Sequence, residues 1–161
     1  MSLNIRIGLN GSDVQDAIQK LEKYRDDLDR KAKLICYKLA DYGARRADIR
    51  FSTAYYDGNN DVDVTVEETD KGYVIKASGE AVLFIEFGSG VRYGYGHPDV
   101  HGYGPGTYPG KGHWDDPNGW WIPKSAGGGH TYGNPPSMAM YQTAQDIKAE
   151  VLRVAREVLK A

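Results

Sequence analysis

The sequence predicts an α+β fold, in which an antiparallel β-meander is packed by a long N-terminal helix and a C-terminal helix. Apolar residues recur at helical spacing near both ends of the chain, and apolar and polar residues alternate between those regions. A long Gly-, Tyr- and Trp-rich loop insert precedes the last helix. We predict a single domain, 1–161, made of 1–87 (strand, helices and meander), 88–134 (loop) and 135–161 (C-terminal helix).

Composition and patterning exclude several classes of protein. The formal net charge is −2, so the whole-chain charge gives no signal for nucleic acid, and we expect no specific nucleic-acid ligand. The single cysteine, Cys36, rules out an internal disulfide framework, and its helical surroundings predict a buried side chain. The chain has no apolar run of about 20 residues and no signal-peptide layout. We therefore expect a soluble protein that does not bind membranes and is made in a cytoplasm.

The first 50 residues predict one short strand followed by helix. Residues Asn4 to Gly8 alternate in the manner of a strand, and Ser12 is a suitable N-cap for the helix that follows. Apolar residues from Val14 to Tyr42 recur at a spacing of four and three, which places them along one helix face. Arg25 interrupts this face beside an acidic cluster. The interruption favours a short first helix and a long second helix to about Arg50, with a single long bent helix as the alternative.

Three consecutive strands are predicted next. Alternating valines indicate a half-buried strand from Asp61 to Thr69, and Gly72 can adopt the positive φ of a hairpin turn before the return strand from Tyr73 to Ala77. The apolar run AVLFIEFGSG, Ala81 to Gly90, fits a strand buried on both faces because it is short and glycines close it. Periodicity alone does not exclude a buried helix there. We favour the strand, which would complete a meander covered by the long helix.

The last helix is predicted to begin after Pro135 and Pro136, with Ser137 as its cap, and to run to Lys160. Within the preceding apolar run, Glu86 is the one carboxylate that raises a chemical question. An unpaired buried carboxylate is costly, so Glu86 must face solvent or have a cationic or backbone partner. No second carboxylate or base stands at a spacing that would support acid–base catalysis, so we expect no catalytic residue.

The insert, 88–134, has no sustained period, yet its aromatic residues predict a segment that orders against itself or a neighbouring subunit. Its four histidines lie in Gly- and Pro-rich sequence that blocks a helical metal motif, and no thiolate accompanies them. We therefore expect histidines that form hydrogen bonds or face solvent, and neither a metal nor another cofactor. The glycine run 127–129 lacks the lysine and the setting of a phosphate loop. The four histidines are His97, His101, His113 and His130.

Two segments, FIEFGSG at 84–90 and HTYGNPPSMAMY at 130–141, resemble the bacteriophage tail-component family. This family comprises head–tail joining, tail-completion and minor tail proteins of long-tailed phages and prophages. The segment from Trp120 to Pro135 also resembles the version found in phages of Gram-positive hosts. The stretch RRADIRFSTAYYDGNN departs from the family, which often carries an Ala-Pro and a Thr-Gly element there.

The resemblance implies a structural virion protein, not an enzyme, that acts without a cofactor at the head–tail junction or tail end. It implies a homo-oligomeric ring that contacts neighbouring connector and tail proteins, located in the virion and, during assembly, in the host bacterial cytoplasm. The alternative is a loop-based carbohydrate- or metal-binding protein or hydrolase. Aromatic side chains are typical interface anchors. Our interface candidates are Trp114, Trp120, Trp121, Tyr132, Glu86 and Phe87.

Overall fold

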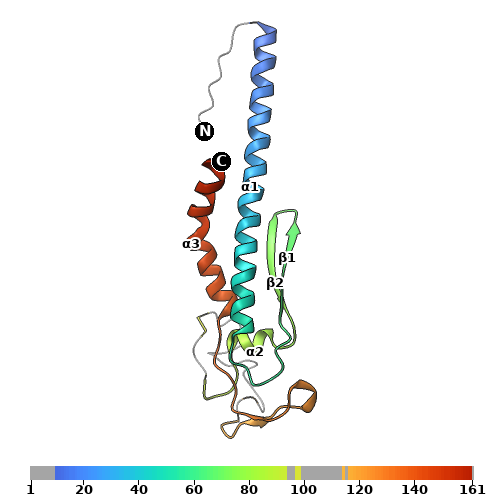
Figure 1. Ribbon diagram of the computed structural model, residues 1–161, viewed down its shortest axis with the longest axis vertical. Helices are drawn as coiled ribbons and strands as arrows, with labels where there is room; N and C mark the ends of the chain where they lie inside the picture. The colour runs from blue at the N-terminus through green and yellow to red at the C-terminus, as the bar shows by residue number, and fades with distance from the viewer. Residues whose placement is uncertain (1–9, 94–96, 99–113, 115, 161) are drawn as a thin grey trace.

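The computed structural model describes residues 10–93, 97–98, 114 and 116–160. Figure 1 shows an elongated molecule in which α3 packs along one side of α1 and the β1–β2 hairpin along another. The arrangement confirms the predicted α+β fold with helices at both ends of the chain. The elements are α1 (Gly11–Ser52), β1 (Asp63–Thr69), β2 (Gly72–Ser78), α2 (Val82–Phe87), β3 (Trp120–Trp121), the 3-10 helix η2 (Lys124–Ala126), β4 (His130–Thr131) and α3 (Ala139–Lys160).

Helix α1 is one continuous helix, so the alternative of a single long helix is the correct one. Its N-cap is Asn10 rather than the expected Ser12, and the Asn10 side chain accepts the backbone N–H of Asp13 at 2.9 Å. At the predicted break, Arg25 forms an exposed ion pair with Asp26. A charged residue interrupts an apolar stripe without breaking backbone hydrogen bonds, because only Gly and Pro strongly disfavour a helix interior.

The hydrophobic core lies where the C-terminal part of α1 meets α2 and the start of α3. Gly43 permits the close approach of neighbouring elements, since a Cβ there would lie 2.5 Å from a methyl of Ile147 in α3 and 2.5 Å from one of Ile75 in β2. The five buried apolar residues of this core are Ala47, Phe51, Ala81, Ile85 and Ala139.

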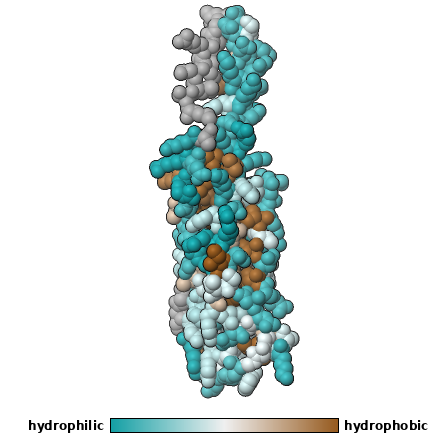
Figure 2. All heavy atoms as spheres, in the orientation of Figure 1, coloured by the Kyte–Doolittle hydropathy of each residue, from teal (hydrophilic) through white to brown (hydrophobic). Residues whose placement is uncertain are grey.

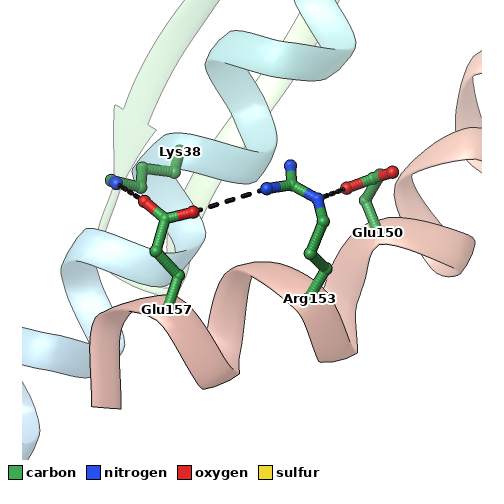
Figure 3. A network of polar contacts seen from close by, with 4 residues as sticks. All are labelled: Lys38, Glu150, Arg153 and Glu157. Carbon is green, nitrogen blue, oxygen red and sulfur yellow. Dashed lines mark hydrogen bonds and ion pairs between the residues drawn. The ribbon is translucent and has the colours of Figure 1, made fainter. Parts of the chain in front are cut away.

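Polar contacts join α1 to α3 outside the core. The carboxylate of Asp146 in α3 accepts hydrogen bonds from Arg50 at 2.8 Å and Arg46 at 3.1 Å, both in α1. Further along the same pair of helices, Lys38 lies 2.6 Å from Glu157, which Arg153 also approaches (Figure 3). The Asp146 pairs and the Lys38–Glu157 pair bridge α1 and α3.

The β1–β2 hairpin follows the prediction. Its two strands pair antiparallel with Thr69 opposite Gly72, and Gly72 has φ 134° after the two-residue turn. Residues of β1 alternate between half-buried and exposed, as the valine pattern predicts. Cys36 is exposed, which corrects the expected burial. The expected strand at 4–8 lies outside the described residues.

The predicted third strand is wrong, because Val82–Phe87 forms the helix α2. The Ile85 N–H donates to the Ala81 carbonyl at 2.9 Å, and both side chains are buried in the core. A spacing of four puts Ala81 and Ile85 on one face, and the backbone hydrogen bond between them is the one that a helix forms. Gly88, with φ 77°, ends the helix. The sheet is therefore a two-stranded hairpin rather than a meander.

Candidate functional site

The two segments that carry the family resemblance pack against each other in a single unit, which we call the junction (84–90 and 130–141). The backbones of Ser89 and Asn134 exchange two hydrogen bonds, of 2.9 and 3.0 Å, and the Ser89 hydroxyl donates to the Asn134 side chain at 2.6 Å. The Asn134 amide also donates to the Phe84 carbonyl at 2.8 Å. Gly133 lets the two segments approach closely, because a Cβ there would lie 2.0 Å from the Ser89 carbonyl oxygen.

Glu86 is buried inside this junction, at 5% exposure. Its carboxylate accepts the backbone N–H groups of Met140 at 2.8 Å and Tyr141 at 3.0 Å, which are among the unpaired donors at the start of α3. The Nε2 atom of His97 lies 3.1 Å from the same carboxylate. A negative charge at a helix N-terminus is favourable, so Glu86 stabilises α3. Of the two alternatives for Glu86, exposure to solvent or a cationic or backbone partner, the structure shows the second.

The burial of Glu86 also corrects its place among the interface candidates, because its side chain points into the chain rather than to the surface. Phe87 is half-buried, and its ring lies 4.4 Å from that of His97. His97 is itself buried and hydrogen-bonded, in one of the two states expected for the loop histidines. His101 and His113 lie outside the described residues.

Strands β3 and β4 form a small hairpin with two different faces. Trp120 pairs with Thr131, and Trp121 pairs with His130. Side chains of successive strand residues point to opposite faces, so the two adjacent tryptophans face in different directions. Trp120 lines a cavity beneath the hairpin, whereas Trp121 is 75% exposed.

The exposed face of the hairpin carries a row of side chains in contact with one another. We call it the outer strip (Trp121, His130, Tyr132 and Arg92). The Trp121 ring lies edge-on to His130 at 5.2 Å, and His130 lies edge-on to Tyr132 at 5.0 Å. The Arg92 guanidinium lies over the Tyr132 ring, 3.4 Å from its centre. Aromatic and arginine side chains held in place in this way are typical of the anchors of protein interfaces.

The opposite face of the hairpin covers a cavity of about 360 Å³ with aromatic walls. The Tyr56 and Phe84 rings stack with their centres 6.5 Å apart, and Phe84 lies 5.5 Å from Trp114. Trp114 meets Trp120 edge-on at 5.6 Å. Of the predicted interface residues, Trp114 and Trp120 therefore line a cavity, and Trp121 and Tyr132 stand at the surface.

The cavity is also acidic. Asp57, Asp61 and Glu80 line it, and no lysine, arginine or histidine is among the described lining residues. The backbone N–H groups of Ala81 and Glu80 hold the pKa of the Asp61 carboxyl below its usual value. Burial raises the pKa of the Tyr56 hydroxyl, and the nearby charges of Asp61 and Glu80 raise it further.

A second exposed feature lies at the other end of the molecule, where α1 extends beyond α3 and the hairpin (Figure 1). Four apolar residues on this projecting part are between 41% and 49% exposed, and we call them the free stripe (Val14, Ile18, Leu21 and Leu28). Polar side chains dominate the face of the projecting part seen in Figure 2. The projecting part is therefore an amphipathic helix on which these four apolar side chains are partly exposed, whereas Ala17 is buried.

Within the described residues, no group of three or more His, Cys, Asp or Glu side chains is placed to hold a metal ion. No described helix is long and apolar enough to cross a membrane. Comparison of the chain with family models, curated proteins and solved structures finds no match.

Proposed function

We propose that this chain is a structural protein of a bacteriophage or prophage tail, at the head–tail junction or tail end. It acts by assembling with copies of itself into a ring and by contacting neighbouring virion proteins. The observation that carries this proposal is the presence of two separate exposed surfaces, the free stripe and the outer strip, at opposite ends of one elongated chain (Figure 1).

Two different surfaces on one chain suit a head-to-tail contact between subunits. A contact of this kind generates a ring when the rotation between neighbouring subunits closes, whereas a two-fold dimer uses the same surface twice. The outer strip offers aromatic anchors, and the free stripe offers apolar side chains at helical spacing. Partly exposed apolar side chains that share one helix face support a role in protein contact.

The junction supports a structural interpretation of the residues that resemble the tail-component family. Glu86 stabilises the start of α3, and the Ser89 and Asn134 side chains bond to each other. Their polar atoms are directed within the chain, and their task is to hold the outer-strip hairpin against the helical body. A structural role for these residues supports the proposal.

The proposal is tested by the mass of the purified full chain, measured by light scattering after size exclusion over a wide range of protein concentration. We expect an oligomer of defined mass whose population rises with protein concentration. The Trp121→Ser variant should form less of it at each concentration. Trp121 is exposed, whereas Trp120 lines the cavity. Changing Trp121 alone therefore removes a surface side chain and leaves the folded interior intact. Val74→Ser is the matched control, because Val74 is 48% exposed on β2, away from both surfaces. A monomer at every concentration, or an oligomer that Trp121→Ser leaves intact while Val74→Ser dissolves it, would contradict the proposal.

A further inference from the structure

Three carboxylates line the cavity beneath the β3–β4 hairpin, and none of the described lining residues is cationic. Asp61 accepts hydrogen bonds from two backbone N–H groups, and Asp57 accepts one from the Thr131 hydroxyl at 2.6 Å. All three donors are neutral. The Glu80 carboxylate forms no hydrogen bond or ion pair within the described part of the chain. All three acidic residues are exposed, so their carboxylates keep contact with water and can meet a cationic group that enters the cavity.

The walls of the cavity add a second attraction for cations. The faces of tryptophan, tyrosine and phenylalanine rings carry partial negative charge and attract cationic groups at close range. Four such rings follow one another around the cavity, each in contact with the next, at centre distances between 5.5 and 6.5 Å. Carboxylates and aromatic faces together select for a positively charged organic group.

We propose that this cavity binds the guanidinium group of an arginine side chain presented by a partner polypeptide. A guanidinium is planar and weakly hydrated, so it stacks on aromatic rings, and its five N–H donors can satisfy several carboxylates together. A volume of about 360 Å³ accommodates the side chain and part of the backbone that carries it. A neutral sugar would stack on the aromatic walls and donate its hydroxyls to the carboxylates, but it would bring no opposite charge. This inference goes beyond self-assembly and is independent of it.

The tryptophans provide a direct readout of binding. The chain contains three, of which Trp114 and Trp120 line the cavity and Trp121 lies outside it. We expect acetyl-Gly-Arg-Gly-amide, titrated into the ¹⁵N-labelled full chain, to shift the indole N–H signals of Trp114 and Trp120 saturably and to leave that of Trp121 in place. The Trp121→Phe variant identifies the third signal.

A matched peptide tests the charge. Acetyl-Gly-citrulline-Gly-amide has nearly the same shape as the arginine peptide and no charge, so we expect it to bind at least about tenfold more weakly. This comparison uses the wild-type chain and does not depend on a variant that folds. A peptide with lysine in place of arginine should also bind more weakly, because an ammonium group neither stacks nor forms paired hydrogen bonds.

A matched pair of variants tests the site. Glu80→Gln keeps the side-chain shape and removes one charge at the cavity, and we expect it to weaken arginine-peptide binding about five- to tenfold. Glu68→Gln makes the same change on β1, outside the cavity, and should leave binding unaltered.

Equal binding of the arginine and citrulline peptides would overturn the proposal. So would the absence of any shift at about 10 mM peptide, well above a millimolar Kd. Shifts of the same two indoles by maltotriose, with none by the arginine peptide, would instead identify a carbohydrate site. Loss of self-association in any variant has no bearing on these outcomes, because each is measured on the peptide complex.

Discussion

The two ends of α1 have the same helical backbone and very different surroundings. Near its C-terminal end, Ala47 and Phe51 are 0% and 1% exposed and pack against α2 and the start of α3. Near its N-terminal end, Ile18 and Leu21 are 46% and 49% exposed. One end is held by tertiary contacts, and at the other end the apolar side chains are partly exposed. The comparison shows that a regular apolar spacing establishes a helix face without establishing what covers it.

The largest difference between the two ends should come from deleting apolar side chains. We expect Phe51→Ala to lower the free energy of unfolding by about 3–5 kcal/mol, because it leaves a cavity in the core. Leu28→Ala, in the free stripe, should change it by less than about 0.5 kcal/mol in dilute solution. Urea unfolding of both variants at the same low protein concentration measures the two values. Similar losses at both positions would mean that the free stripe is already packed in the monomer.

Two glycines of the insert test how much the close packing at the junction contributes to stability. Gly133 and Gly129 both have positive φ, of 94° and 99°, but a Cβ at Gly133 would meet the Ser89 carbonyl, whereas a Cβ at Gly129 would meet nothing within 4 Å. We expect Gly129→Ala to cost about 1–2 kcal/mol from backbone strain alone. Gly133→Ala should cost about 1–3 kcal/mol more, because neighbouring backbone must move.

Thermal unfolding followed by circular dichroism compares these two glycine variants. Equal midpoints would show that the close approach of Ser89 and Gly133 contributes nothing beyond the backbone conformation.

We expect a smaller effect from removing the charge of Glu86 at the start of α3. Glu86→Gln keeps the shape of the buried side chain and removes its charge from the N–H groups of Met140 and Tyr141, so we expect a loss of about 1–3 kcal/mol. Glu157→Gln removes an exposed charge paired with Lys38 and should cost less than about 1 kcal/mol. Chemical unfolding checks both. A greater loss for Glu157→Gln would contradict the role assigned to Glu86.

The smallest expected effect is a pH dependence at the α1–α3 contact. Hydrogen bonds from Arg50 and Arg46 hold the pKa of Asp146 below its usual value. A carboxyl whose pKa is lower in the folded chain stabilises it fully above the unfolded pKa of about 4 and loses that contribution as pH falls through the folded value. Asp146→Asn should therefore flatten this part of the acid-side decline in stability.

Asp48→Asn is the control for that pH series, since it removes an equal charge from an exposed position of α1. It should retain the wild-type slope between about pH 5 and pH 2. If stability falls with pH at the same slope in both variants, Asp146 does not contribute to the acid-side decline.

Elements that carry a long local period could be predicted from the sequence. The stripe of α1 and the alternating valines of β1 each repeat often enough to reveal their structure, and Gly72 marks the turn between strands. The run 82–87 could not be assigned in the same way, because five apolar residues around one glutamate fit a buried strand or a short helix equally well. Its helical form depends on packing against Phe51 and on the glycine that ends it.

The candidate site could be predicted in residue type but not in arrangement. A partner for Glu86 followed from the cost of an unpaired carboxylate, yet its identity depends on residues 54 and 55 positions away. The two-residue strands β3 and β4 are too short to show a period, so the opposite directions of Trp120 and Trp121 could not be read from the chain. Neither could the cavity, which is assembled from four separate segments.

Hydrogen exchange of the full chain at low and high protein concentration shows which surfaces its copies cover. We propose that the junction is complete within one chain, whereas the free stripe and outer strip become covered on self-association. We predict that amides of 11–28 and 119–132 become protected as concentration rises, while those of 82–90 and 134–143 stay equally protected. Full protection of 11–28 at the lowest concentration, or a rise in mass with no change in either surface, would contradict the claim.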